Sequence, residues 1–514
     1  MRTCPAFLPA VILALLSASP AVADDVVLRF DNVPEGGLVV ADVDLTAAAR
    51  WCGVEAVAPA GIRAADADAG TLQFIPDADF DPRQRVRGVL VARLPGRGSV
   101  RLSLQFGPGE PIPETSQGRI ETAGFEIVHD PAKQGGLPSR LVFRGTGKAV
   151  ESIRWQDRTY HKQQGVFRLA DDPQSRVTRI ADGPLCTAVR VAARFVRAGG
   201  EPPESKPEAV YQWLYLRDAP LVYVTAVQRQ QQPFTWPEAH FLELHQSGDE
   251  LPQWAGGNPV QSGEFRGAET SSSFRDWAAM HDGRNAVAML HCDGILVYDG
   301  KGGYGPYLHA HGSAAWTPWS STERRLSAWL WIGSGDNPLQ SIQQAAERLP
   351  ALAEVTVTVG QVQTRLQQAR ADLEKLAGDA QRQARLQLAV AERLECQGRF
   401  QESLGAVAGQ MPERLHMLSA GDLGLLLERP DSGIRPLQLL DAASGVQLLA
   451  AQPLPLFSLT LRPGGGKGDV PVAADDGWRQ AEIERLDDGR VKLAWSGQQR
   501  DGLDGLRVEA VAAL

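Results

Sequence analysis

The sequence predicts a mainly β protein of several antiparallel sandwiches, including one large sandwich, with a short α-helical hairpin inserted between two of them. Three observations support this. Short alternating or β-branched runs recur through most of the 514 residues, and Gly and Pro separate these runs. A three- and four-residue apolar spacing, typical of helices, occurs in one stretch at 361–409.

The strands divide into regions of different character. Residues 24–113 form short strands, with 86–94 and 99–106 expected to pair across a Pro/Gly turn. A Pro/Gly-rich linker ends this small N-terminal sandwich, and 118–350 continue as one large antiparallel sandwich. Residues 415–514 return to strands. Their opening echoes 123–196, which suggests a second sandwich that ends early.

The stretch at 361–409 is expected to form a helical hairpin. Val362, Leu366, Ala369 and Leu373 lie on one face of a helix at this spacing. Gly378 is expected to end the first helix, because glycine weakens helix interiors.

Residues 1–23 have the features of an export signal. Arg2 precedes an apolar run at 6–16, and 21–23 (Ala-Val-Ala) offer a cleavage site before Asp24. The run is too short to span a bilayer. We therefore expect an exported protein, periplasmic or extracellular, with no integral membrane segment.

Charge and cysteine content exclude some classes of function. The 61 acidic residues outnumber the 52 basic ones, for a formal net charge of −9, which argues against a general nucleic-acid binder. The cysteines after residue 23 are widely spaced and match no metal motif. Cys186 and Cys292 are compatible with a disulfide or with two separate buried thiols.

Aromatic and titrating residues concentrate in the large sandwich. All seven tyrosines lie between Tyr160 and Tyr307, and nine of twelve tryptophans and seven of nine histidines lie between Trp155 and Trp331. Flat apolar rings beside polar donors suit a sugar-binding cleft, and imidazole and phenol are common proton-transfer groups. A large sandwich core would concentrate aromatic residues as well.

The segment 236–245 contains two candidate acid–base pairs. On a regular strand Glu238 and His240 share one face, while Glu243 and His245 share the other. Only one face lines a cleft, and we expect it to be that of Glu238 and His240, beside Trp236. A histidine on the buried face would be a hydrogen-bonded core residue.

The loop and strand after Tyr298 contain a second group of candidates. His309 and His311 are two residues apart and share a strand face. They are compatible with a metal pair, which needs a third ligand, with catalytic or binding histidines, and with structural ones. No motif in the sequence requires a cofactor. The sequence is also compatible with binding of a divalent metal. The G-x-S-x-G, Walker and H-E-x-x-H motifs are absent.

Three segments, Trp236–His245, Trp254–Gly257 and Tyr304–Trp319, in a long β region resemble the galactose-mutarotase-like supersandwich proteins. The resemblance covers about 118–335 and restarts near 415. This superfamily includes central domains of polysaccharide lyases and accessory domains of glycoside hydrolases. The resemblance therefore implies a protein that acts on or binds a polysaccharide or oligosaccharide.

A uronate polysaccharide lyase would eliminate the group beta to the sugar carboxylate. A Tyr or His removes the alpha proton, and Arg, Asn or His neutralises the carboxylate. The catalytic candidates are Tyr304, Tyr307, His309, His311 and His240. The substrate-binding candidates are Trp236, Glu238, Trp254, Asn258, Arg266, Trp316 and Trp319, with Asn258 or Arg266 as neutraliser. The alternatives are a non-catalytic carbohydrate-binding sandwich protein and an envelope scaffold.

Overall fold

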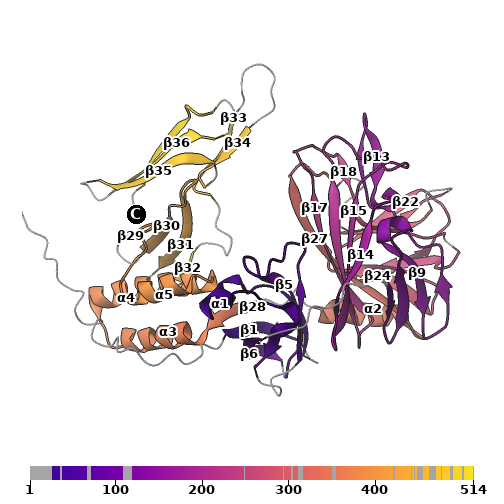
Figure 1. Cartoon of the computed structure of the whole chain (residues 1–514), viewed down its shortest axis with the longest axis horizontal. Helices are drawn as coiled ribbons and strands as arrows, with labels where there is room; N and C mark the ends of the chain where they lie inside the picture. The colour runs from indigo at the N-terminus through magenta and orange to yellow at the C-terminus, as the bar shows by residue number, and fades with distance from the viewer. Residues whose placement is uncertain are drawn as a thin grey trace, which may run out of the picture. The chain divides into compact units, whose positions relative to one another are not determined.

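The fold is that of a computed structural model (Figure 1), which describes residues 26–34, 37–65, 71–95, 97–107, 118–247, 249–292, 294–301, 305–310, 317–349, 355–420, 423–441, 443–444, 446–448, 455–461, 470–475, 477–486, 490–499 and 503–512. The predicted export signal lies outside these residues. The chain divides into two compact units, described separately below: residues 28–49 with 54–355, and residues 1–27, 50–53 and 356–514. Strands account for 49% of the structure and helices for 16%, which confirms the predicted mainly β, multi-sandwich fold.

The N-terminal strands form two small sheets. One contains β1 (Val26–Val33), β6 (Gly98–Phe106) and β3 (Ile62–Ala64), and the other has the order β2 (Leu38–Asp44), β5 (Arg87–Arg93), β4 (Thr71–Pro76). Helix α1 (Thr46–Trp51) and a 3₁₀ turn (Pro59–Gly61) connect them. The predicted pairing of β5 with β6 is wrong. Strand β5 is buried over Gly88–Ala92 because it is the central strand of its sheet, and β6 belongs to the other sheet.

The large sandwich is built on a nine-stranded sheet, several of whose strands run side by side in Figure 1. Its order is β14 (Arg176–Asp182), β15 (Cys186–Arg194), β16 (Glu208–Leu216), β17 (Leu221–Arg229), β27 (Glu323–Ser334), β24 (Asn285–Leu290), β23 (Trp277–His281), β20 (Gln253–Gly256) and β21 (Gln261–Glu264). All its pairings are antiparallel.

Three smaller sheets accompany it. The five-stranded sheet has the order β11 (Arg154–Trp155), β19 (Phe241–His245), β26 (Tyr307–Ala310), β25 (Ile295–Asp299) and β22 (Thr270–Phe274). The four-stranded sheet has the order β10 (Ala149–Val150), β9 (Pro138–Phe143), β8 (Phe125–His129) and β7 (Arg119–Glu121). The three-stranded sheet has the order β13 (Gly165–Arg168), β12 (Arg158–His161) and β18 (Glu238–Ala239). Two 3₁₀ turns lie at Gln134–Gly136 and Leu169–Asp171.

The main core lies between the nine-stranded sheet and the smaller sheets. Trp213 and Val224 enter it from the nine-stranded sheet, and Leu244 and Val297 enter it from the five-stranded sheet. Each such side chain contributes roughly 1.5–3 kcal/mol on burial. This core fixes which face of the five-stranded sheet is apolar, and its other face is therefore available for polar side chains.

A second core covers the opposite face of the nine-stranded sheet. Val40 and Ile75 from the N-terminal sheets, Trp331 from β27, and Ile342 from α2 (Pro338–Arg348) belong to it. Asn337 begins α2, and its side chain accepts the Gln340 N–H at 3.2 Å. Both faces of the nine-stranded sheet are thus covered within this unit.

The other unit contains the predicted helices and the C-terminal strands. Its helices are α3 (Gly360–Leu373), α4 (Gly378–Cys396) and α5 (Phe400–Val407), and they follow β28 (Val355–Val359). One sheet has the order β29 (Leu415–Ala420), β30 (Leu423–Glu428), β31 (Arg435–Asp441), β32 (Val446–Gln447). A two-stranded sheet pairs β33 (Ser458–Leu461) with β34 (Val470–Ala473). The last sheet contains β35 (Trp478–Arg485), β36 (Val491–Gln498) and β37 (Arg507–Ala512). Strands β29–β32, like β7–β10, form a four-stranded meander. The second sandwich expected from the sequence echo stays a prediction.

Two further features of the described residues concern the cysteines and the helices. Cys186 and Cys292 form no disulfide with each other, and burial raises the pKa of the Cys186 thiol to about 12. No helix in the described part of the chain combines the length and apolar character needed to cross a bilayer.

Candidate functional site

The outer face of the five-stranded sheet is polar. On β19 and β26, Leu244 and Leu308 enter the main core. The alternate positions, Glu243 with His245 and Tyr307 with His309, project to the opposite side because side chains alternate along a strand. Glu243 lies opposite His309, and His245 lies opposite Tyr307. We call this surface the polar face.

A row of side chains crosses the polar face from strand to strand. The register aligns its members as Arg154, His245, Tyr307, Tyr298 and Ser271. The rings of His245 and Tyr307 stack with centroids 4.7 Å apart, and those of Tyr307 and Tyr298 lie 5.1 Å apart. Arg154 and Ser271 at the ends are exposed, Tyr298 is half-buried, and Tyr307 is 8% exposed. We call this set the aromatic row.

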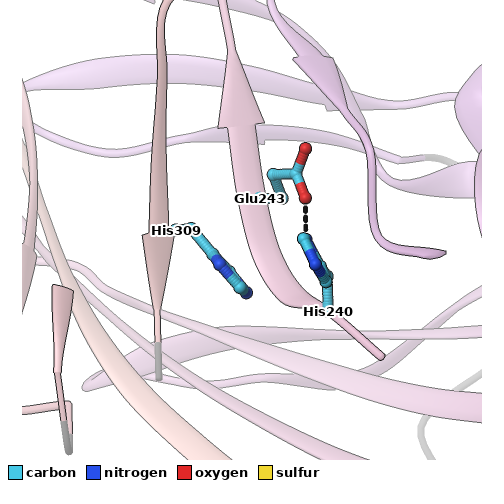
Figure 2. A group of neighbouring side chains, drawn as sticks. All are labelled: His240, Glu243 and His309. Atoms are coloured by element: carbon cyan, nitrogen blue, oxygen red, sulfur yellow. Dashed lines mark hydrogen bonds and ion pairs between the residues drawn. The ribbon is translucent and has the colours of Figure 1, made fainter. Parts of the chain in front are cut away.

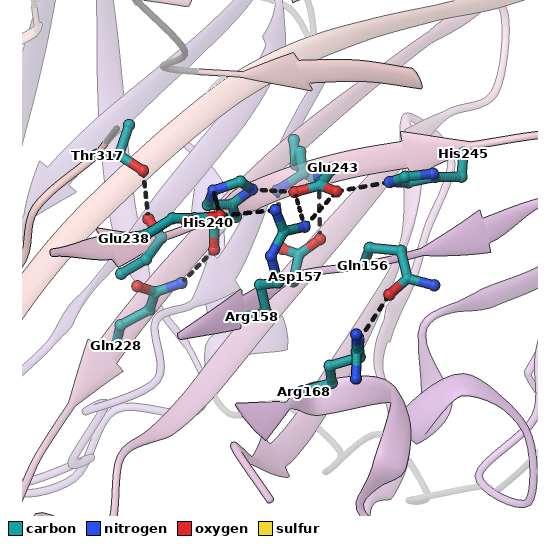
Figure 3. Close-up of polar contacts among 12 residues, drawn as sticks. Gln156, Asp157, Arg158, Arg168, Gln228, Glu238, His240, Glu243, His245 and Thr317 are labelled. Atoms are coloured by element: carbon teal, nitrogen blue, oxygen red, sulfur yellow. Dashed lines mark hydrogen bonds and ion pairs between the residues drawn. The ribbon is translucent and has the colours of Figure 1, made fainter. Parts of the chain in front are cut away.

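Glu243 lies at the centre of a buried ion-pair cluster beside this row (Figure 3). Arg158 Nη1 donates to both carboxylate oxygens, at 2.5 and 2.6 Å. His245 Nε2 donates to Oε1 at 2.6 Å, and His240 Nδ1 donates to Oε2. The Glu243 side chain has no exposed surface. Its charge is therefore balanced entirely by protein donors, as a buried carboxylate requires.

A second carboxylate completes the cluster. Glu238 Oε1 lies 2.6 Å from Arg158 Nη2 and 2.8 Å from His240 Nε2. The His240 ring therefore lies between two carboxylates: Nδ1 is hydrogen-bonded to Glu243, and Nε2 is in ion-pair contact with Glu238, without hydrogen-bond geometry. Both carboxylates favour the imidazolium form of the ring. When His240 is protonated, the positive charges of Arg158 and His240 balance the negative charges of the two carboxylates, Glu238 and Glu243.

The pKa values of the cluster follow from this arrangement. Burial acts to lower the pKa of His240, but the charge of Glu243 and the contacts to Glu238 and Glu243 outweigh it and raise that pKa. Burial acts to raise the pKa of Glu243, yet His240, His245 and Arg158 hold it well below its usual range. The pKa of Glu238 is lowered as well, by His240 and Arg158 against the effect of burial. Glu238 and Glu243 are therefore ionised at neutral pH, and the equilibrium of His240 is shifted toward imidazolium.

A backbone bulge brings Glu243 to His240. Strand pairing shifts register between Phe241 and Glu243, and Leu242 has φ 53°, in the left-handed region that non-glycine residues rarely adopt. The bulge interrupts the alternation along 238–245, so Glu238, His240 and Glu243 converge around one guanidinium. The sequence-based prediction that Glu238/His240 and Glu243/His245 lie on opposite faces is therefore wrong.

His309 adds a third imidazole. Its ring stacks on that of His240, with centroids 4.1 Å apart and planes 14° apart (Figure 2). Ligand atoms of His240, Glu243 and His309 lie within 4.8 Å of one another. A metal ion, however, binds in the plane of each imidazole ring, and two parallel stacked rings share no such point. Both Glu243 oxygens also accept N–H groups from Arg158. These residues therefore do not fit a divalent metal site.

Only some of the site residues predicted from the sequence lie at this centre. Tyr307, His309, His240 and Glu238 lie in the aromatic row or the cluster beside it. Tyr304, His311 and Trp316 lie outside the described residues. Sequence reasoning gave Arg158, Glu243 and His245 no leading role, because a strand position does not reveal which partner lies across the sheet. The pair Glu243/His245 could have been chosen only by anticipating the bulge.

The predicted sugar-binding tryptophans have other roles. Trp236 has no exposed surface and Trp319 only 2%; each donates its backbone N–H to the other's carbonyl, and both side chains belong to the main core. In this structure neither ring is exposed enough to stack on a sugar, so the structure gives no support to their predicted binding role. Trp254 is partly buried against the same core.

Asn258 and Arg266 lie apart from the cluster. Asn258 is exposed in a turn after β20. The Arg266 side chain is 75% exposed and pairs with Glu264 at 2.7 Å. No described contact joins either residue to Glu243 or His240. They are therefore poor candidates for neutralising a carboxylate at this centre.

Comparisons with known proteins give structural likeness alone. No protein-family model and no curated protein match the chain. Similar solved structures include an α-mannosidase from Enterococcus faecalis V583 (9% identity, TM-score 0.38, 65% of this chain and 46% of that one). Others are an α-N-acetylgalactosaminidase from Bifidobacterium bifidum (12%, 0.31, 45% and 39%) and a galactose-mutarotase-related enzyme from Lactobacillus acidophilus (6%, 0.29, 44% and 99%).

The matched solved structures thus include carbohydrate-active enzymes and a galactose-mutarotase-related protein. The chain spans less than half the length of the mannosidase and of the galactosaminidase. TM-scores and identities this low assign no activity to the chain.

Replacing Glu243 tests the cluster directly. In Glu243→Gln, the pKa of His240 should fall by about 1–3 pH units, because an opposite charge in contact with the ring is lost. NMR titration of the histidine ring signals measures this. Glu264→Gln, which removes an exposed carboxylate, is the matched control and should leave His240 unchanged. An unaltered His240 titration in Glu243→Gln would contradict the described contacts.

Asp157 should make stability depend on pH. Burial raises its pKa to about 6, against the hydrogen bonds that favour its ionised form. The folded state therefore prefers the neutral carboxyl, and this contribution is present below about pH 4 and lost as pH rises through about 6. Relative to Asp157→Asn, the wild type should lose on the order of 3 kcal/mol of unfolding free energy between about pH 4 and pH 7. Denaturant unfolding across this range measures it, and parallel pH profiles would contradict it.

Proposed function

We propose that this protein is an exported carbohydrate-active enzyme whose polar face binds the sugar. The observation that carries the proposal is the aromatic row, in which stacked rings lie beside an ionised imidazole–carboxylate cluster and end at an exposed arginine. Aromatic faces bind the C–H surface of a pyranose, and proton transfer requires titrating groups within reach. The leader predicted at 1–23 supports export.

Within this class, we propose β-elimination on a uronate polysaccharide. Arg154 is exposed at the end of the row next to His245 and can pair with the sugar carboxylate. Tyr307, which is 8% exposed, is the proposed base that takes the proton alpha to that carboxylate, and His309, which is 2% exposed, is its proposed partner. The electron pair released forms the carbon–carbon double bond, the bond from the beta carbon to the glycosidic oxygen breaks, and that oxygen takes a proton from an acid such as imidazolium His240.

Glu243 acts in this scheme through its charge. Three donating side chains and a strongly lowered pKa leave it ionised, so it is a poor proton acceptor. Its part is to hold His240 protonated and His245 oriented, as a fixed carboxylate does for a catalytic imidazole.

One observation favours a second candidate function. His240 and Glu243 are 2% and 0% exposed, as expected of a structural ion-pair cluster. In that case the exposed end of the aromatic row would bind sugar without chemistry, and the chain would be a carbohydrate-binding sandwich protein.

An elimination assay separates the two functions. The purified protein is incubated with uronate polysaccharides, and the ultraviolet absorbance of the unsaturated product is followed. Tyr307→Phe should reduce kcat roughly a hundredfold or more if the phenol transfers the proton. His161→Gln, which changes a histidine with no contact to the cluster among those described, is the control. Binding of the polymer without any unsaturated product would favour the binding function.

Arg154→Ala tests the anionic substrate. Loss of a charge-assisted hydrogen bond, about 1.5–3 kcal/mol, should raise KM for the uronate polymer roughly tenfold to a hundredfold with little change in kcat. Arg266→Ala removes an exposed arginine that is paired with Glu264, and it should leave KM unchanged. Equal KM effects of the two variants would exclude Arg154 as the carboxylate-binding residue.

A further inference from the structure

A second buried polar group lies behind the cluster, on the core side of the 238–243 segment. Asp157, adjacent in sequence to Arg158, has no exposed surface. Its carboxylate accepts the backbone N–H of Leu242 at 2.8 Å and that of Glu243 at 3.0 Å. It also accepts the phenolic O–H of Tyr211 on β16. The two backbone groups are those of the bulge itself.

The bulge needs these acceptors. Its register shift leaves Leu242 without a partner across the ladder, and the N–H groups of both Leu242 and Glu243 turn to Asp157; a buried N–H without an acceptor costs about 1–3 kcal/mol. Leu242 also carries the cost of a left-handed conformation. Asp157 satisfies both N–H groups with one carboxylate, so the conformation that turns Glu243 toward His240 depends on it.

Other side chains donate hydrogen bonds to backbone carbonyls elsewhere in this irregular segment. Arg324 Nη2 donates to the carbonyl of Ala239 at 2.8 Å, as does Thr317 Oγ1. Gln228 Nε2 donates to the carbonyl of His240 at 3.4 Å. These contacts hold the segment before the bulge, whereas Asp157 alone reaches the two N–H groups of the bulge among the described contacts.

We propose that Asp157 and Tyr211 are positioning residues for the acid–base centre: Tyr211, on the nine-stranded sheet, orients the Asp157 carboxylate, which holds the Leu242 bulge and so places Glu243 against His240. The nine-stranded sheet thereby determines the geometry of a site on the far side of the five-stranded sheet. This inference deepens the proposed function and concerns the same site, but its first readout requires no substrate.

The test compares two tyrosines on one strand. Tyr211→Phe removes the O–H bonded to Asp157. Tyr215→Phe, four residues along β16, removes an equally buried O–H that lies 2.6 Å from His129 Nε2, remote from the cluster. Each variant loses one buried hydrogen bond and keeps its ring, so their stabilities should fall similarly. The site should respond to the first variant alone.

The readout is the pKa of His240, followed by NMR. In Tyr211→Phe it should fall by about one pH unit, because the Glu243 carboxylate loses its fixed place beside the ring. It should stay at the wild-type value in Tyr215→Phe. Asp157→Asn, which keeps the side-chain volume but offers one acceptor oxygen, should lower it as well and provides the test if Tyr211→Phe does not fold. An unchanged His240 pKa in Tyr211→Phe or Asp157→Asn would overturn the inference.

Activity gives a separate measurement. If the enzyme catalyses β-elimination on uronates, Tyr211→Phe should lower kcat at least tenfold without changing KM. Tyr215→Phe should change neither kcat nor KM. A lowered His240 pKa together with no activity on any polymer would leave the positioning role intact and remove the proposed reaction. A lowered kcat with an unaltered His240 pKa would contradict positioning through Glu243.

Discussion

The buried negative charge of Glu243 is the constraint on which the site depends. A carboxylate without solvent must be surrounded by donors, because an uncompensated buried charge costs several kcal/mol. Arg158 supplies donors from one segment of chain, and His240 and His245 supply them from another. Their convergence fixes the protonation of His240 and the orientation of His245, whose ring stacks on Tyr307. The acid–base character of the polar face therefore follows from the requirement to neutralise one side chain.

Two sheets together determine the position of the Glu243 carboxylate. The five-stranded sheet supplies the alternation that places Tyr307 and His309 on the polar face, while Asp157 and Tyr211 hold the bulge from the core side. Ionised Asp157 is itself disfavoured by burial, as its raised pKa shows. The buried Asp157 charge therefore lowers stability at neutral pH while it keeps a strained backbone in place, and strained residues cluster at functional sites.

Regular periodicity made much of the fold predictable, and departures from it explain the errors. Alternating and β-branched runs located the strands of the large sandwich, and the spacing of Val362 and Leu366 located α3. Strand pairing was not predictable, since β5 and β6 adjoin in sequence yet belong to different sheets. The importance of His240 could be inferred from residue type, whereas Arg158 required knowledge of the neighbouring strand. A left-handed Leu242 has no sequence signal, so the convergence of Glu238, His240 and Glu243 could not be anticipated.

The central claim is that the polar face beside Glu243 is where the sugar binds. The most direct measurement is an NMR titration of the isotope-labelled histidine rings with an acidic oligosaccharide. The account predicts that the signals of His245, His309 and His240 shift with added sugar, while that of His129, buried against Tyr215 in the core, stays fixed. Unchanged signals for the first three histidines at saturating oligosaccharide would contradict the claim.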